Sequence, residues 1–233
     1  MPRSFTSLAI DAALSSRIVV FADACSMLDI IRMPVEHDKL HQTDISFLRD
    51  RVIGECPSVL IVCSKKVISE IKVNQEAEIA LYRNKVREAY KIYSEQESRL
   101  NMITGSKSVS IDYDDNSDSL STIALFHKVL NDTYISGIKH VDIYKAAIRS
   151  ISYIPPASRK KDSLADCLIF SSYLRCMKLL RDMGIKNRFV FISSNKKDYC
   201  FEPYVNPHSE IANELSTCNA TYEKSWKGLY GYV

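Results

Sequence analysis

The sequence predicts an α/β protein, a three-layer α/β/α sandwich with a central, mainly parallel sheet. Three runs rich in Val, Ile and Phe predict its buried strands, at Arg17–Ala22, Ser58–Cys63 and Arg188–Ile192. Continuous apolar runs of this length are typical of strands covered on both faces, as in parallel sheets. The first two runs pass directly into patterns of helical spacing, and the third passes into a polar turn. Strands that alternate with helices favour a sheet with helices on both sides.

The first strand ends at Asp23, and a helical pattern starts immediately after it. In open parallel sheets the carboxyl ends of the strands form the ligand crevice, so a carboxylate there is well placed for chemistry. Asp is also a common cap of the helix that follows it. Asp23 alone leaves both interpretations open.

Further acidic side chains follow similar junctions. Glu70 lies in the first turns of the helix after the second strand, and Asp198 follows Asn195 in the turn after the third. Asp162 and Asp166 are four residues apart at the start of an apolar helix, which sets them on one helical face. This repeated association of acids with strand ends and helix starts favours a functional site over simple capping.

The order of these junctions resembles that of the PIN-domain nucleases. Their pattern is a strand ending in Asp, a Val-x-x-Glu helix, an Asp-x-x-Ile helix and a strand closed by Thr-Asn/Asp-x-x-Asp-Phe. The similar stretches here are Asp23–Ser26, Val67–Glu70, Asp166–Ile169 and Ser194–Tyr199. The resemblance extends from about residue 17 to about residue 215, and the order of four motifs is more specific than any one of them.

The resemblance implies a PIN-like fold and a hydrolase that uses Mg²⁺ or Mn²⁺ to cleave RNA. It implies catalytic roles for Asp23, Glu70 and Asp166, which would also bind the metal. Asp162 and Asp198 are further candidate metal ligands, and the candidate supporting residues are Ser26, Ser194 and Asn195.

The chemistry of phosphodiester hydrolysis agrees with a metal. The reaction needs an activated water and neutralisation of the charge that builds on the phosphate, and a hard divalent cation supplies both. Clustered acids also repel one another when no cation is present. We therefore expect the carboxylates of Asp23, Glu70 and Asp166 to converge around one cation and its waters. In the metal-free protein, at least one of them should have a raised pKa.

Two positions depart from the family pattern. Cys25 stands where a hydroxyl or amide is common, and Asn195 stands where many relatives carry a fourth acid. Two alternatives therefore remain. One is a catalytically silent PIN-like module that binds RNA or a protein. The other is a Mg²⁺-dependent phosphohydrolase that uses Asp23 on a small substrate.

Basic residues flank the acids at two places. The formal net charge is only +3, which by itself does not indicate nucleic-acid binding. Their positions are more informative, because a phosphate backbone needs cations beside the metal site. The candidate nucleic-acid-binding residues are Arg159, Lys160, Lys161, Lys196 and Lys197. The alternative is that these are solvated turn residues.

Composition narrows the classes of function. The chain has 7 Cys without a metal-ligand spacing and only 6 Gly, and it lacks the GxGxxG, GxxxxGK[ST] and HExxH patterns. An odd Cys count without a signal pattern predicts a reducing compartment, and we expect a cytoplasmic protein. No segment reaches the length of a membrane span. RNA is the expected substrate, while a protein partner or a homodimer stays open.

The expected organisation is a single domain over residues 1–233, with a core at about 17–215. A helical insertion is expected at about 74–150, and an aromatic tail that contains Trp226 at the C-terminus. Residues 74–103 predict one long helix, which projects as an arm or packs across the sheet. One or two further short strands are expected, for which Tyr199–Val205 is a candidate.

Overall fold

The computed structural model describes residues 3–32, 42–104, 117–157 and 163–232. Within these ranges, six strands form one sheet in the order β1-β4-β3-β2-β5-β6, and every pair of neighbours is parallel. The strands are β1 (Arg3–Ser4), β2 (Ile18–Ala22), β3 (Val59–Ser64), β4 (Tyr134–Ser136), β5 (Phe189–Ile192) and β6 (Ala220–Glu223). The expected parallel sheet is therefore confirmed.

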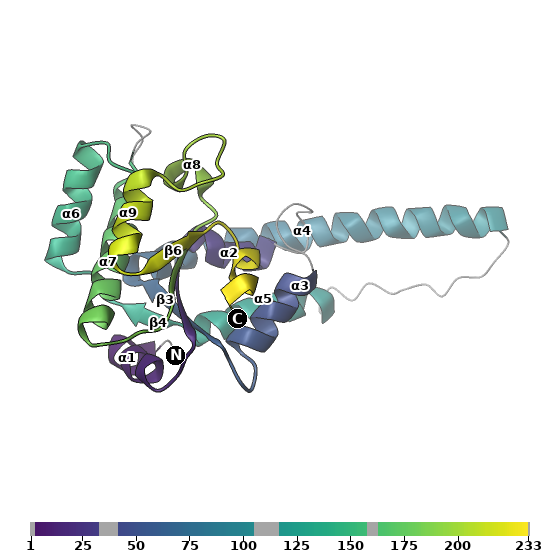
Figure 1. Cartoon of the computed structure of the whole chain (residues 1–233). Coiled ribbons are helices and arrows are strands. Elements are labelled where there is room, and N and C mark those ends of the chain that lie inside the picture. The colour runs from purple at the N-terminus through teal and green to yellow at the C-terminus, as the bar shows by residue number, and fades with distance from the viewer. Residues whose placement is uncertain (1–2, 33–41, 105–116, 158–162, 233) are drawn as a thin grey trace.

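Helices cover both faces of this sheet (Figure 1). Helices α6 and α7 pack together on one face, and α2, α4 and α5 form a layer on the other. The α-helices are α1 (Phe5–Ala13), α2 (Ala24–Arg32), α3 (Gln42–Phe47), α4 (Lys65–Thr104), α5 (Ser117–Asn131), α6 (His140–Ile151), α7 (Leu164–Asp182), α8 (Lys196–Tyr199) and α9 (Ser209–Thr217). A π-helix, η1 (Leu48–Val52), and a 3₁₀ helix, η2 (Trp226–Tyr232), complete the described elements.

The three central strands lie within one residue of the predicted ranges. Every residue of β2, β3 and β5 is buried, which explains why their sequences are apolar on both faces. Aromatic rings fill the space between the sheet and α7. Tyr173 of α7 contacts Phe21 and Phe191 with ring centroids 5.4 and 5.9 Å apart. These contacts fix α7 against the middle of the sheet.

The strand expected near Tyr199–Val205 is wrong. This region contains the end of α8 and a loop, in which Cys200 makes only an isolated bridge with Pro207. Pro203 cannot donate to a sheet ladder, and Tyr204 has a positive φ of 64°, so neither residue suits a strand. The edge strand that pairs with β5 is β6, which begins only at Ala220.

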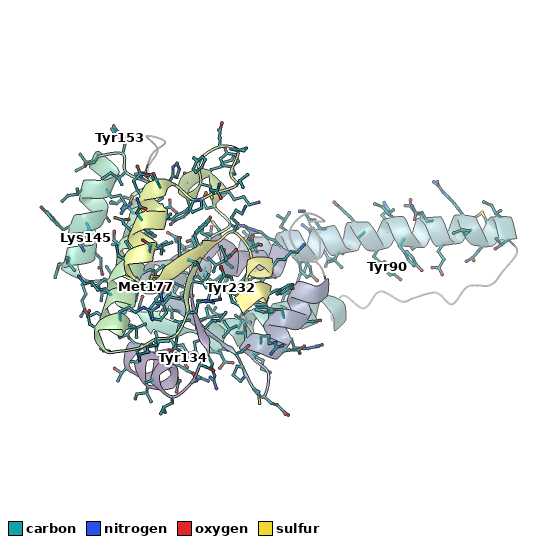
Figure 2. All side chains as sticks on the ribbon, viewed as in Figure 1. Tyr90, Tyr134, Lys145, Tyr153, Met177 and Tyr232 are labelled. Carbon is teal, nitrogen blue, oxygen red and sulfur yellow. The ribbon has the colours of Figure 1, made fainter. Side chains whose placement is uncertain are left out.

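Helix α4 begins in the body of the protein and continues outward as an arm (Figure 1). Its buried residues, Val67, Ile71 and Tyr82, all lie in its first half. Further along, Ile92 and Leu100 are 58 and 59% exposed. Figure 2 shows Tyr90 on the part of the helix that extends beyond the body. The first half of α4 therefore packs, and its second half projects.

The aromatic tail docks on the body. The Trp226 side chain is 1% exposed, and its Nε1–H donates a hydrogen bond of 2.8 Å to the backbone oxygen of Ser26. The ring of Tyr230 contacts that of Phe47 at 4.9 Å between centroids. The tail thereby covers α2 close to its N-terminus, the end at which Asp23 lies.

Candidate active site

The chain order of the strands sets the position of the candidate site. From β2 the chain adds β3 and β4 on one side of the sheet, and it later adds β5 and β6 on the other. The point of reversal lies between β2 and β5, where open parallel sheets form a crevice at the carboxyl ends of the strands. Asp23 follows β2 directly, and its backbone N–H donates to the oxygen of Ile192 at the end of β5. Asp23 therefore lies at the switch point.

The Asp23 carboxylate is 1% exposed and accepts two hydrogen bonds. The Ser193 hydroxyl donates to Oδ2 at 2.7 Å, and the Ala24 amide donates to Oδ1 at 2.7 Å. The pKa of Asp23 is raised to about 6, because burial and the charges of Glu70 and Asp29, which raise it, outweigh the two hydrogen bonds, which lower it. Asp23 thus accepts a hydrogen bond from the first amide of α2, as a capping residue does. It also lies close enough to other acids for their charges to raise its pKa.

Asp166 lies near Asp23 and belongs to α7, in the helical layer that α6 and α7 form on one face of the sheet. It lies in the first turn of α7, so the helix presents its carboxylate close to the edge of the sheet. The pKa of Asp166 is raised to about 7, chiefly by burial and in addition by the charges of Asp23, Asp198 and Glu70. The expectation that at least one of the three principal acids has a raised pKa is confirmed by Asp23 and Asp166.

Glu70 lies in the second turn of α4 and acts electrostatically on both Asp23 and Asp166. Its carboxylate pairs with Lys66, one helical turn earlier, at 3.3 Å between Nζ and Oε1. The Glu70 side chain is 26% exposed and that of Lys66 35%. The sequence analysis did not single out Lys66, although its spacing of four residues from Glu70 is the signal that could have done so.

Asn195 connects two of the acids. Its Nδ2 donates a hydrogen bond of 2.7 Å to Oδ2 of Asp198, and a further hydrogen bond from its side chain lowers the pKa of Asp166. The amide therefore stands between two carboxylates as a donor. This contact explains how the site accommodates Asn where relatives carry an acid.

The predicted supporting serines differ in their roles. Ser26 is 1% exposed, and its Oγ accepts a hydrogen bond of 2.9 Å from the backbone N–H of Ser194. Ser194 thus contributes its backbone to this contact, whereas the side chain that touches Asp23 belongs to Ser193. The register of β2 and β5 pairs Ala22 with Ile192, so the residues that follow them, Asp23 and Ser193, are neighbours. That pairing could not be read from the isolated motifs.

Cys25 is not activated as a nucleophile. Burial raises the pKa of its thiol to about 12, and the charges of Asp23 and Asp29 add to this effect. Nucleophilic cysteines need the opposite change, a lowered pKa that populates the thiolate. The carboxylates are therefore the chemically competent groups here.

The basic candidates divide into two sets. Lys196 and Lys197 are exposed on α8, between Asn195 and Asp198 in the sequence. The other candidates, Arg159, Lys160 and Lys161, lie outside the described residues, as does Asp162.

The donor set suits a hard cation. Asp23, Glu70, Asp166 and Asp198 supply only oxygen ligands, the type that Mg²⁺ and Mn²⁺ prefer. In the part of the chain that the structure describes, no three His, Cys, Asp or Glu side chains form a group ready to hold a metal ion. Mg²⁺ commonly keeps several waters and uses one or two carboxylates, so a complete protein cage is not required.

One protein-family model is similar to most of the chain. A protein-family model described as PIN domain matches residues 20–199, which include Asp23, Glu70, Asp166 and Asp198. No curated protein and no solved structure gave a match. Among the described helices, none combines the length and the apolar character that crossing a membrane requires.

Proposed function

Because this chain belongs to the PIN-domain family, whose members are of the nuclease type, we propose that it is a metal-dependent ribonuclease. In this proposal Asp23, Glu70 and Asp166 form the active site. The substrate is RNA, and the reaction is hydrolysis of a phosphodiester bond with Mg²⁺ or Mn²⁺.

One observation carries the proposal. Burial raises the pKa of both Asp23 and Asp166, and the charge of Glu70 adds to both shifts, while the charge of Asp23 also raises the pKa of Asp166. The charged neighbours with the largest influence on both residues are acids, not Lys or Arg. A structural ion-pair network would instead lower the pKa of the carboxyl groups. Buried acids whose charged neighbours, among the described residues, are mainly other acids form the electrostatic environment that a bound cation would stabilise.

The residues of the chain have distinct tasks in this mechanism. Asp23, Glu70 and Asp166 would hold the cation and its waters through carboxylate oxygens, and Asp198 is a further candidate ligand. The bound cation would supply charge neutralisation and an activated water. Ser193 and the Ala24 amide orient the two oxygens of Asp23 by their hydrogen bonds. Asn195 holds Asp198 in place.

Phosphate contacts would come from the exposed lysines of α8. Lys196 and Lys197 precede Asp198 directly, so a strand whose phosphate lies at the acids passes close to both. Their contribution should weaken with salt because it depends on releasing counterions from the RNA.

The test is cleavage of RNA by the purified chain. We expect cleavage with Mg²⁺ or Mn²⁺, none with a chelator, and none for Asp23→Asn, which keeps the size of the side chain and removes its charge. An Asp23→Asn variant that cuts at the wild-type rate would remove Asp23 from the mechanism.

A catalytically silent binding module is the second candidate. The ion pair between Lys66 and Glu70 favours it, because a lysine already neutralises one of the acids. A wild-type chain that binds RNA and never cuts it with either metal would establish this second function.

A further inference from the structure

A tightly tied loop follows the candidate site. It covers residues 200–208, between α8 and α9, and begins two residues after Asp198. The His208 amide donates to the Tyr199 oxygen at 2.9 Å, which closes the loop at its base. Within it, the Tyr204 amide donates to the Phe201 oxygen at 2.7 Å, and Lys224 Nζ donates to the Val205 oxygen at 3.0 Å. The loop is therefore held by two backbone hydrogen bonds and by one from the side chain of Lys224, which lies outside the loop.

This loop presents an aromatic ring to solvent. Tyr199 and Cys200 are buried, whereas the next residue, Phe201, is 46% exposed. The ring of His208 lies beside that of Phe201, tilted by 57° with centroids 6.3 Å apart, and so supports it from within the loop. A preformed loop with an exposed ring loses little conformational entropy when a ligand stacks on that ring.

Three types of side chain are concentrated in six residues. Lys196 and Lys197 supply exposed positive charge, Asp198 belongs to the acidic site, and Phe201 supplies an aromatic face. Three residues of chain span at most about 11 Å, so Phe201 lies within that distance of Asp198. Proteins that hold single-stranded nucleic acid combine cations along the backbone with aromatic rings under the bases.

We propose that Phe201 is a stacking site for one unpaired base of an RNA strand whose neighbouring phosphate lies at the acidic site. This inference rests on the proposed nuclease function and adds to it a second contact outside the acids. A base inside a duplex is already stacked on both faces and cannot use this ring. The site therefore selects a single-stranded segment beside the cleaved bond.

A protein partner is less consistent with this surface. Stable protein interfaces bury roughly 800 Å² on each partner, with an apolar centre. Here the exposed large apolar side chains of the loop are only Phe201 and Val205, and exposed lysines lie close by. One exposed ring, which lies beside Glu202 and close in sequence to two exposed lysines, is too small an apolar surface for a stable protein interface and is large enough for one base.

The experiment compares variants that separate the aromatic face from apolar bulk. Phe201→Leu keeps an apolar side chain but has no ring, and Phe201→Trp enlarges the ring. Val205→Ala is the matched control, because Val205 is 58% exposed on the same loop and has no ring. All are made in the Asp23→Asn background without added metal, so that binding of a single-stranded RNA oligonucleotide can be measured by fluorescence anisotropy without cleavage.

We expect Phe201→Leu to weaken binding about 5- to 150-fold, the range for loss of one base stack. Phe201→Trp should bind as well as the parent or better, and Val205→Ala should change the affinity less than about twofold. An oligonucleotide series with one abasic position should locate the stacked base. Loss of that base should weaken binding to the parent protein and have no further effect on Phe201→Leu.

The possible failures can be distinguished. Equal affinities for Phe201→Leu and Val205→Ala in the Asp23→Asn background, together with RNA cleavage by the wild-type chain, would overturn the stacking site and leave the nuclease function intact. A wild-type chain that neither binds nor cleaves RNA would overturn both. Thermal unfolding of each variant checks that the loop substitution leaves the fold intact.

Discussion

The Ser193 hydroxyl donates a hydrogen bond of 2.7 Å to the carboxylate of Asp23 across 170 residues of sequence. The contact exists because β2 and β5 are neighbours and their register pairs Ala22 with Ile192. It lowers the pKa of a carboxyl group that burial raises. The backbone oxygen of Ser193 accepts a hydrogen bond of 2.7 Å from the hydroxyl of Tyr222 on the neighbouring strand β6. The junction after β5 thus supports the acid at the end of β2.

The raised pKa values predict an unusual dependence of stability on pH. The pKa of Asp166 is about 7 in the folded protein, against an ordinary value of 3.8, so the folded state binds a proton that the unfolded state releases. Between about pH 4 and pH 7 the metal-free protein should lose stability as pH rises. Asp166→Asn should therefore raise the free energy of unfolding at pH 8, by on the order of 2 kcal/mol, and leave it nearly unchanged at pH 4.

Asp182→Asn is the matched control for this experiment, since Asp182 is exposed at the end of the same helix. It should leave the pH profile from urea denaturation unchanged. A metal-free Asp166→Asn protein that is less stable than wild type at pH 8 would contradict the repulsion between the acids.

Metal binding should reverse this instability. A ligand that binds only the folded state stabilises it by about 2.7 kcal/mol at a concentration of 100 times its Kd. We therefore expect Mn²⁺ to raise the unfolding temperature of the wild type at pH 7.5, and to raise it much less for Asp23→Asn or Asp166→Asn. The control Asp182→Asn should respond as the wild type does. If Mn²⁺ raised the unfolding temperature of all four proteins equally, the cation would bind elsewhere and not at these acids.

The strands and their acids could be predicted because their signals are local. The segment Ile18–Ala22 is apolar at every position and ends at an acid, so strand, burial and junction are all visible in six residues. Asp166 is similarly marked by its place at the start of an apolar helix. Such patterns identify a site residue when its own stretch of sequence shows both the secondary structure and the position of the residue within it.

Ser193, β1 and β6 could not be predicted, because their roles depend on pairing between distant segments. Ser193 faces Asp23 only through the register of two strands. The strand β1 lies at the sheet edge beside β4. It has only two residues, which is too short for its sequence to show the alternation of polar and apolar residues that indicates a strand. In β6 only Ala220 is buried, so the segment lacks the continuous apolar run of the central strands.

Lys66 should compete with a cation for Glu70. Its ammonium lies 3.3 Å from the Glu70 carboxylate in the metal-free protein. Lys66→Met removes this charge and keeps the length of the side chain, so Mn²⁺ should bind more tightly, by up to about fivefold for a partly exposed pair. The control is Lys72→Met, an exposed position on the same helix. Unchanged or weaker Mn²⁺ binding, measured by calorimetric titration, would show that Glu70 does not contribute to the metal site.

Tyr173 joins the strand ends on which the acids depend. Its buried hydroxyl donates to the Ala22 oxygen at 2.5 Å and accepts from the Ser64 amide at 3.0 Å, so it ties α7 to the carboxyl ends of β2 and β3. Tyr173→Phe leaves both backbone groups buried without this partner, which should lower the free energy of unfolding by about 2–4 kcal/mol. Because Asp23 follows Ala22 directly, the loss should also weaken Mn²⁺ binding.

The control for Tyr173→Phe is Tyr134→Phe, which removes the hydroxyl of another buried tyrosine (Figure 2). The Tyr134 hydroxyl bonds to Asp11 and Arg3 on the β1 side of the sheet, away from the acids. Tyr134→Phe should therefore reduce stability without changing the affinity for Mn²⁺. Urea denaturation and Mn²⁺ titration of the two variants separate the effects. If Tyr173→Phe loses stability but binds Mn²⁺ as the wild type does, its hydroxyl stabilises the sheet without positioning Asp23, and the metal site tolerates movement of the strand end.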